Sequence, residues 1–315
     1  MDAPAPASGR SRFRDIGEFA LAWAVLESLE WIPRPLADRL AGVYLRLADR
    51  AIPRLRSVAE RNLALALPEL DPARRAAIIG GVFRSIARLL VSVAKFPSIR
   101  RENLDRWIRF EGYEHFENAR RAGRGVLFAT AHLGNWELSA YAHALVAEPL
   151  DIVVRPLDNP LLDRLAARRR EWSGNRLLSK REPARPILKA LAANRAVGIL
   201  IDQNVSAESG LFINFFGIPA ATDSGFVRIA ARSGAAVIPG FALWCEKEDR
   251  YVLRFYPPIP ISGDALRDTQ ALHSVLEAVI REYPEQWLWI HRRWKTRPAG
   301  FPSLYEEVRV GTQAL

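Results

Sequence analysis

The sequence predicts an α/β protein with a mainly parallel central sheet flanked by helices, preceded by an all-helical N-terminal region that associates with a membrane. Two patterns support this fold class. From Trp107 onward, apolar runs of strand length alternate with helical patterns, which is typical of a parallel sheet covered by helices. Before that point the apolar side chains repeat at helical spacing. The chain has 315 residues, 49% of them hydrophobic, and can therefore fill a sizeable core.

The charge of the chain favours an anionic partner. Its formal net charge of +10 fits nucleic acid, an acidic protein or an anionic membrane surface. No basic and aromatic strand motif and no zinc spacing supports a nucleic-acid binder, so no nucleic acid is expected as a partner. The single cysteine, Cys245, fits a reducing compartment and is interpreted as a small buried hydrophobe, because no histidine lies near it in the sequence.

The first two segments are predicted to be a flexible basic N-terminus over 1–15 and a membrane-anchoring helix over 16–32. The helix is apolar but carries Glu18, Glu27 and Glu30. Two of these, Glu27 and Glu30, stand where the cleavage site of a signal peptide should follow. A charged side chain at the centre of a membrane span costs about 3 kcal/mol. The glutamates therefore favour a shallow or tilted anchor over a full span, and an ordinary core helix is the alternative.

Residues 33–105 are predicted to form a helical N-terminal region. Pro35 begins a helix whose apolar side chains repeat at spacings of three and four, with arginines off that stripe. A longer helix is predicted over 72–95, with Asp71 as its N-cap and Pro97 as its stop. These helices are either a packing layer or a surface that lies on lipid.

Residues 106–298 are predicted to form the core that contains the sheet, and 299–315 a tail. Strands are expected over 126–130, 152–155, 197–202, 236–244 and 250–256. Helices are expected over 135–146, 159–172, 186–194, 223–233 and 270–282, and an aromatic and basic segment closes the core over 284–298.

The stretch GVLFATAHLGNWEL, residues 125–138, has the pattern of a buried strand that ends in a polar turn and opens a helix. His132 and Glu137 lie five residues apart, so on one continuous helix they would point about 140° away from each other. His132 therefore belongs to the turn. Asn135 is then the N-cap, and Glu137 falls in the first helical turn, from which its carboxylate can fold back toward the imidazole.

Such a pair has the chemistry of a general base. A carboxylate that holds one ring nitrogen leaves the other free to accept a proton from an alcohol. A satisfied structural pair is the alternative that this spacing leaves open. The spacing is not that of the His-Glu-x-x-His motif of zinc proteases, so no metal is expected.

This block resembles a known family. HLGNWE is similar to the His-x4-Asp/Glu block of the late acyltransferases of lipid A biosynthesis, the lauroyl and myristoyl transferases, which are distantly related to glycerolipid acyltransferases. Five further blocks match in the same order along nearly the whole chain. They are RNLALALPEL at 61–70, RPLDNP at 155–160, ILIDQN at 199–204, FFGIPAATDSG at 215–225 and PEQWLWIHRRWKTRP at 284–298.

The resemblance implies an acyltransferase core over 106–298 that works at the cytoplasmic face of the inner membrane without a cofactor. It implies transfer of a fatty acyl chain from an acyl carrier protein thioester to a hydroxyl of a lipid A precursor. In this interpretation His132 deprotonates the acceptor, and Glu137 orients and charges the imidazole. The alcohol then attacks the thioester directly, because no serine or cysteine is placed to carry an intermediate.

Several residues are candidates for oxyanion stabilisation or substrate binding. Arg155, at a strand end near His132 in the predicted sheet, is the first candidate, and the turn around Gly134 and Asn135 is the second. A salt bridge to Asp158 or Asp202 is the alternative role of Arg155. Asp202 and Gln203 end a buried strand and either contact substrate or hold Arg155. Asn159 and Thr222 are weaker candidates, since both stand where helix caps are expected.

Two basic regions are candidates for contacts with anions. One is the run of cations from Arg164 to Lys189, either a solvated face or a docking surface for the carrier protein or the acceptor's phosphates. The other contains Trp289, Arg292 and Arg293, which fit either a membrane interface or cation–π packing inside the fold. Three further histidines, at positions 115, 143 and 273, lie outside the matching blocks and are interpreted as surface or packing residues.

Other functions remain open at the level of sequence. Relatives of this family acylate mannosylated inositol lipids, so the acceptor could be another membrane glycolipid or a phospholipid. A basic membrane-binding protein without catalysis would also explain the charge and the amphipathic helices.

Overall fold

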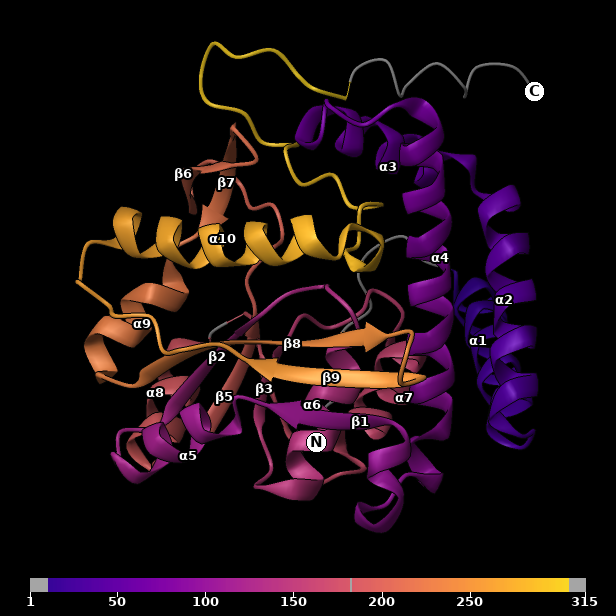
Figure 1. Ribbon diagram of the computed structural model, residues 1–315, viewed down its shortest axis with the longest axis horizontal. Coiled ribbons are helices and arrows are strands. Elements are labelled where there is room, and N and C mark those ends of the chain that lie inside the picture. The colour runs from indigo at the N-terminus through magenta and orange to yellow at the C-terminus, as the bar shows by residue number, and fades with distance from the viewer. Residues whose placement is uncertain (1–10, 182, 306–315) are drawn as a thin grey trace.

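The computed structural model describes residues 11–305 apart from residue 182. Seven strands form the central sheet: β1 (Ile108–Glu111), β2 (Val126–Thr130), β3 (Asp151–Val154), β4 (Arg176–Ser179), β5 (Ala196–Leu200), β8 (Ala236–Cys245) and β9 (Arg250–Phe255). They lie in the order β1-β9-β8-β2-β5-β3-β4 (Figure 1). A separate antiparallel pair is formed by β6 (Gly210–Phe215) and β7 (Ile218–Asp223).

The central sheet is mainly parallel, as predicted. Every neighbouring pair in it is parallel except β8 and β9, which form a hairpin. The prediction placed five of its strands, and it missed β1 and β4. Both are four-residue edge strands with little buried surface, so they lack the apolar run that marks β2 or β8. The β6–β7 pair, which lies above α10 in Figure 1, was also not predicted.

Helices cover both faces of the sheet. On one face lie α5 (Tyr113–Arg121) and α6 (Trp136–Val146), whose buried side chains share a core cluster with Phe128. On the other face lie α8 (Ala184–Ala192), α9 (Gly225–Ser233) and α10 (Ala265–Glu282), which pack around Leu127 and Val237. The remaining core helix, α7 (Pro160–Glu171), packs against the N-terminal helices.

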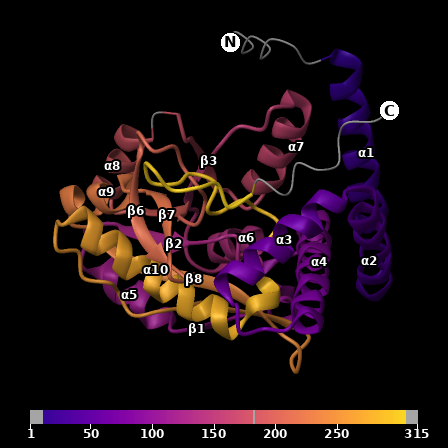
Figure 2. The same ribbon diagram turned by 90° about the horizontal axis from the view of Figure 1, so that it is seen from above.

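Four helices precede the sheet: α1 (Arg12–Glu30), α2 (Arg34–Ala51), α3 (Pro53–Ala66) and α4 (Pro72–Lys95). They stand beside the sheet, with α4 between the sheet and the pair α1 and α2 (Figure 2). Asp71 caps α4 by accepting a hydrogen bond of 2.7 Å from the Arg74 amide. The predicted helical N-terminal region is therefore present, and α3 is an addition to it.

Within the described residues, one helical stretch is long and apolar enough to cross a membrane, Pro72–Ser98. Half of that stretch is buried inside the protein, and a core helix passes the same test of length and composition. Residues 16–30 of the expected anchor lie in α1, which is not the stretch that passes this test. Its glutamates pair within the protein, since Glu30 binds Arg169 of α7 at 2.6 Å and Glu18 binds Arg14 at 2.8 Å.

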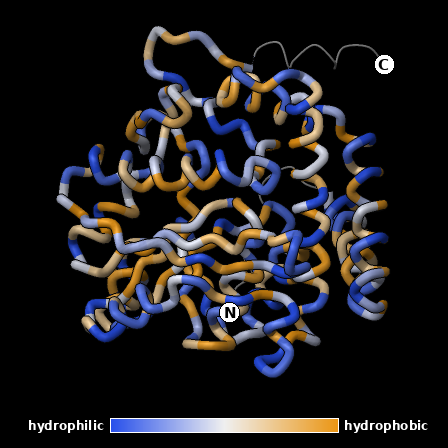
Figure 3. Tube along the Cα trace, in the orientation of Figure 1, coloured by the Kyte–Doolittle hydropathy of each residue, from blue (hydrophilic) through white to orange (hydrophobic). Residues whose placement is uncertain are grey.

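The exposed side of α1 is unusually apolar. Phe13 is 88% exposed, Leu21 68% and Trp31, just beyond the helix, 78%. Figure 3 shows apolar positions interspersed with polar ones along the helices at this side of the molecule. Parts of the predicted N-terminus and tail, residues 1–10 and 306–315, lie outside the described residues.

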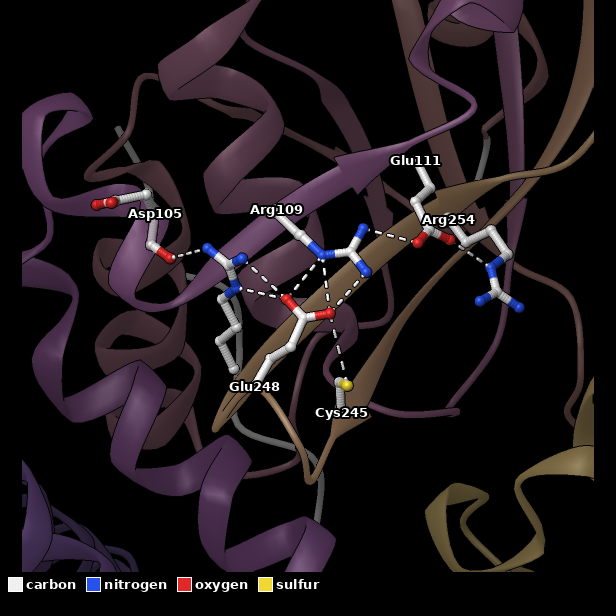
Figure 4. A network of polar contacts seen from close by, with 7 residues as sticks. Asp105, Arg109, Glu111, Cys245, Glu248 and Arg254 are labelled. Atoms are coloured by element: carbon white, nitrogen blue, oxygen red, sulfur yellow. Dashed lines mark hydrogen bonds and ion pairs between the residues drawn. The ribbon is translucent and has the colours of Figure 1, made fainter.

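Ion pairs fasten the edge strand β1 to the turn between β8 and β9 (Figure 4). Arg109 of β1 donates two hydrogen bonds of 2.8 Å to the Glu248 carboxylate, and its remaining nitrogen binds Glu111 at 2.6 Å. Arg254 binds the other side of Glu111 at 2.9 Å. Cys245 lies at the same turn, with its Sγ 3.7 Å from Glu248. The network lies at the β1 edge of the sheet, where β9 is the neighbour of β1.

Candidate active site

The turn between β2 and α6 holds His132 beyond the end of a buried strand, as the sequence predicted. Gly134 in this turn has a φ of 64°. A Cβ at this position would lie 2.0 Å from the carbonyl oxygen of Ala242 in β8, so only glycine permits the close approach. Asn135 caps α6, because its side-chain oxygen accepts a hydrogen bond of 3.0 Å from the Leu138 amide.

The imidazole of His132 is held by Asp202, which follows β5. His132 Nδ1 lies 2.9 Å from Asp202 Oδ1, and the backbone amide of His132 donates to Oδ2 at 3.0 Å. The indole of Trp287 donates to Oδ2 at 2.8 Å. Asp202 is only 2% exposed. Because β2 and β5 pair in parallel, their ends lie side by side and bring these two residues together.

This pairing changes the pKa of both groups. Burial alone would lower the pKa of His132, but the charge of Asp202, the hydrogen bond to it and the charge of Glu137 raise the pKa above its ordinary value of 6.5. Burial alone would raise the pKa of Asp202, but the imidazole and the hydrogen bonds from Trp287 and the backbone hold it well below its usual range. The carboxylate therefore stays ionised and can stabilise a protonated imidazole.

The expected contact between Glu137 and the imidazole is replaced by an ion pair with Arg170 of α7. Glu137 Oε1 accepts from Arg170 Nη2 at 2.6 Å, and Oε2 accepts from Nε at 2.9 Å. From the first turn of α6 the Glu137 side chain reaches α7, whereas Asp202 approaches the imidazole from the neighbouring strand. Glu137 still acts on His132 through its charge, which contributes to the raised pKa.

A cavity of about 860 Å³ lies beside His132. This volume is within the range that binds small molecules. Exposed cations line part of it: Arg155 directly after β3, Lys180 directly after β4, and Arg228 of α9. Its apolar lining comes from both faces of the sheet and includes Phe128, Leu150, Ile152, Ile187, Ile199, Phe226 and Ile229. The cavity thus joins a charged region to an apolar interior next to the imidazole.

Two of the candidate substrate-binding residues line this cavity. The amide nitrogen of Gln203 lies 3.4 Å from Nε2 of His132, on the side of the ring away from Asp202. Arg155 has a side chain that is 79% exposed, and its one ion pair among the described residues is a long one, 3.9 Å, with Asp158. The alternative pairing of Arg155 with Asp202 is not what the described residues show, since Asp202 is bound to His132 and Trp287.

The amides of the turn are already bonded. The Gly134 amide donates to the carbonyl of Gln286 at 2.9 Å, and the Asn135 amide donates to the carbonyl of Ala242 at 2.8 Å. The Asn135 side chain is buried and donates to Ser92 at 2.9 Å. The expectation that this turn donates to an oxyanion is therefore not supported, because its hydrogen bonds hold the turn against β8.

The two weaker candidates have structural contacts. Asn159 caps α7 by accepting from the amides of Leu161 and Leu162, and its amide group donates to Glu18 at 3.0 Å. The Thr222 hydroxyl donates to the carbonyl of Ala220 at 3.1 Å and accepts from Arg293. Both side chains are buried.

The aromatic and basic segment is largely inside the fold. Trp289 and Arg293 are fully buried, and the Arg293 guanidinium lies 5.3 Å from the centroid of Phe215. Arg292 lies 5.7 Å from the centroid of Tyr305. These contacts are those of cation–π packing, so a membrane interface is not proposed for this segment.

Sequence reasoning missed the structural roles of Arg170 and Trp287. Arg170 lay within a long run of cations, and nothing in its spacing distinguishes it from its neighbours. Trp287 is the fixed donor to Asp202 and is 1% exposed. The sequence did contain a signal for Asp202. This residue stands at the end of the strand predicted over 197–202, which belongs to the same predicted parallel sheet as the strand before His132.

Comparison with known proteins identifies relatives of the whole core. The model of the bacterial lipid A biosynthesis acyltransferase family matches residues 8–296. The lipid A biosynthesis lauroyltransferase of Escherichia coli K12 is 32% identical over 90% of this chain and 92% of its own length. The palmitoleoyltransferase of the same organism is 30% identical over 87% of this chain and 90% of its own. The myristoyltransferase of the same organism is 24% identical over 89% of this chain and 88% of its own length.

Proposed function

Because the chain belongs to the bacterial lipid A biosynthesis acyltransferase family, we propose that it moves a fatty acyl chain from an acyl carrier protein thioester to a hydroxyl of a lipid A precursor. The observation that carries this proposal is the position of His132. Its Nδ1 is held by Asp202, and its ring lines a cavity with an apolar interior of the kind a fatty acyl chain needs.

In the proposed reaction, Nε2 of His132 takes the proton of the acceptor hydroxyl as its oxygen attacks the thioester carbonyl carbon. The carbon–sulfur bond then breaks, and the imidazolium returns the proton to the departing thiolate. Asp202 fixes the tautomer and stabilises the imidazolium, a role that the sequence assigned to Glu137. Direct attack needs no covalent intermediate, and the one cysteine, Cys245, lies at the β8–β9 turn instead of the cavity.

The negative charge that develops on the thioester oxygen needs donors. The turn amides are engaged, so we propose Gln203 and Arg155, which both line the cavity. The Gln203 amide is already 3.4 Å from Nε2 of His132, the atom that would face the acceptor. Glu137 is proposed as the residue that holds Arg170 in place and adds negative potential beside the imidazole.

The exposed cations at the cavity suit anionic partners. Arg155, Lys180 and Arg228 can bind phosphates of the acceptor or of the carrier protein's prosthetic group. The exposed apolar side of α1 suits the cytoplasmic face of the inner membrane, where such an acceptor would be held. The helix α1 packs against α7, and Arg170 of α7 lines the cavity. A membrane bound to α1 would therefore lie near the α7 side of the cavity.

An acceptor screen tests the proposal. Membranes that contain the full-length protein receive an acyl carrier protein thioester with a lipid A precursor, a mannosylated inositol lipid or a phospholipid, and acyl gain is measured by mass spectrometry. We expect gain on the lipid A precursor. Gain on one of the other lipids alone would replace the proposed acceptor, and no gain on any lipid would overturn the proposed reaction.

A further inference from the structure

One buried polar side chain in the cavity has no role in the reaction above. His143 lies on the face of α6 that also carries Glu137 and Ala140 and lines the cavity with them. It is 1% exposed, and among the described residues neither ring nitrogen has a hydrogen-bond partner. A buried polar group without a partner is rare and costly, because it loses its hydrogen bonds to water.

The surroundings of His143 are aromatic. Its ring centroid lies 4.6 Å from that of Phe116, 5.2 Å from Phe128 and 6.2 Å from Phe255, in edge-to-face arrangements. Burial lowers the pKa of His143 to about 3, so the ring is neutral, with one donor nitrogen and one acceptor nitrogen. A phenyl face can accept a weak hydrogen bond from the donor nitrogen, but it has no N–H or O–H group to donate to the acceptor nitrogen.

A hydroxyl on an aliphatic chain fits this site better than a water molecule does. A buried water needs two to four polar partners, and three phenylalanine rings surround this imidazole. A hydroxyl can either donate to or accept from the ring, while the rest of its chain is buried by the apolar wall. We propose that the cavity binds an acyl chain that carries a hydroxyl, and that His143 hydrogen-bonds this hydroxyl. This inference rests on the proposed function.

The position of His143 indicates which part of the acyl chain carries the hydroxyl that it binds. The neighbouring ring of Phe128 lies in β2, four residues before His132, and four residues of chain span up to roughly 13 Å. A hydroxyl beside the thioester carbonyl would lie near His132. The hydroxyl that reaches His143 is therefore in the distal half of the acyl chain.

Thr130 is the matched comparison for His143. Its hydroxyl is buried and also without a partner among the described residues, and it lines the same cavity. Residues 128 and 130 share one face of β2, because side chains alternate along a strand, and His132 follows in the turn beyond it. Thr130 therefore lies between the imidazole of His132 and the ring beside His143, where a distal hydroxyl would not bind.

Kinetics with matched donors test the inference. Acyl carrier protein thioesters of one chain length are compared without a hydroxyl, with a hydroxyl beside the carbonyl, and with a hydroxyl in the distal half. We expect kcat/KM to be at least about tenfold higher for the distal hydroxyl than for the plain chain, as for a buried hydrogen bond. His143→Leu should bring this ratio close to one, His143→Asn should keep part of it, and Thr130→Val should keep it.

Two results would overturn the inference: a ratio near one in the wild type, or a high ratio that survives in His143→Leu. Turnover of the plain donor without discrimination would leave the proposed function standing and remove only the inference.

A binding measurement decides the matter even if no donor is turned over. The imidazole nitrogens of His143 are followed by NMR in the full-length protein labelled with ¹⁵N-histidine, with His143→Leu used for assignment. We expect their signals to shift on addition of a distally hydroxylated free fatty acid, and not on addition of the plain fatty acid of equal length. Equal shifts with both, or no shift with either, would contradict the inference.

Discussion

At the scale of single residues, the behaviour of His132 depends on two carboxylates that act in different ways. Asp202 is bound directly to Nδ1 and is nearly inaccessible to solvent. Glu137 is bound to Arg170 and affects the imidazole through its charge alone. The two contributions can be separated, because a directly bound carboxylate also fixes the tautomer whereas a remote charge only shifts the pKa.

Asp202→Asn should lower kcat by roughly 10²-fold to 10⁴-fold, because an amide can hold the imidazole in the wrong tautomer. It should also move the acid limb of the pH profile of kcat/KM to lower pH. The base must be neutral to accept a proton, and the charge of Asp202 is a main cause of the raised pKa of His132. A profile that stays in place would show that Asp202 does not act on the base.

Glu137→Gln and Arg170→Met should shift the acid limb of the pH profile of kcat/KM in opposite directions. Removing the Glu137 charge lowers the pKa of His132, so the limb moves to lower pH. Removing Arg170 leaves the Glu137 charge without its partner, so the limb moves to higher pH. Shifts in the same direction would indicate a general structural disturbance and contradict a role through charge. Unfolding curves of both variants control for loss of structure.

At the scale of elements, the turn between β2 and α6 is the best determined part of the site. It is fixed to β8 by the Asn135 amide and to the segment after α10 by the Gly134 amide. The Leu133 backbone also bridges to Trp287, whose indole donates to Asp202. His132, its partner Asp202 and the donor Trp287 are therefore held by three parts of the chain that meet beyond the ends of the central strands β2 and β5.

Gly134→Ala should destabilise the protein by about 2 kcal/mol or more and reduce activity, because the methyl group would overlap the carbonyl oxygen of Ala242. Gly123→Ala is the matched control. Gly123 also has a positive φ, 76°, but a Cβ there meets nothing within 4 Å. The loss of stability in Gly123→Ala should be limited to the conformational cost of about 1 kcal/mol. Urea unfolding measures both values, and equal losses would contradict the proposed clash.

Much of this arrangement could be predicted from the sequence, because it depends on local patterns. The apolar runs gave β2, β5 and β8, and the turn chemistry at Gly134 and Asn135 placed His132 outside the helix. The edge strands β1 (IRFE) and β4 (RLLS) contain only two apolar side chains each, so they leave no apolar run, whereas β3 (DIVV) contains three in succession. The partner of His132 could not be predicted from spacing, since Glu137 is near in sequence while Asp202 is near in space.

The same limit applies to buried polar residues. His143 has no motif around it, and its unpaired nitrogens become visible only when α5, β2 and β9 bring three phenylalanines around the ring. Arg293 likewise belongs to a basic segment in the sequence but is fully buried in the fold. Burial of a charged or polar side chain depends on tertiary packing, which local periodicity does not report.

At the scale of the whole molecule, α1 carries exposed apolar side chains, which we propose bind the membrane. Phe13→Asp together with Trp31→Asp should reduce the fraction of protein that sediments with anionic vesicles by about tenfold or more, since each exposed ring would bury apolar area in the bilayer interface. Leu266→Asp is the control, because Leu266 is 50% exposed but lies at the start of α10. Equal losses in both variants would contradict a membrane surface at α1.

In the proposed reaction, His132 is the base that activates the acceptor hydroxyl, and acyl transfer depends on it. The most direct test is acyl gain on the acceptor, measured by mass spectrometry with His132→Ala, with His115→Ala of α5 as a control histidine outside the cavity. Asp202 keeps its hydrogen bond from Trp287, so the variant is expected to fold. We predict that His132→Ala loses at least 10²-fold in rate while His115→Ala stays near wild type. Full activity in a folded His132→Ala protein would contradict the account.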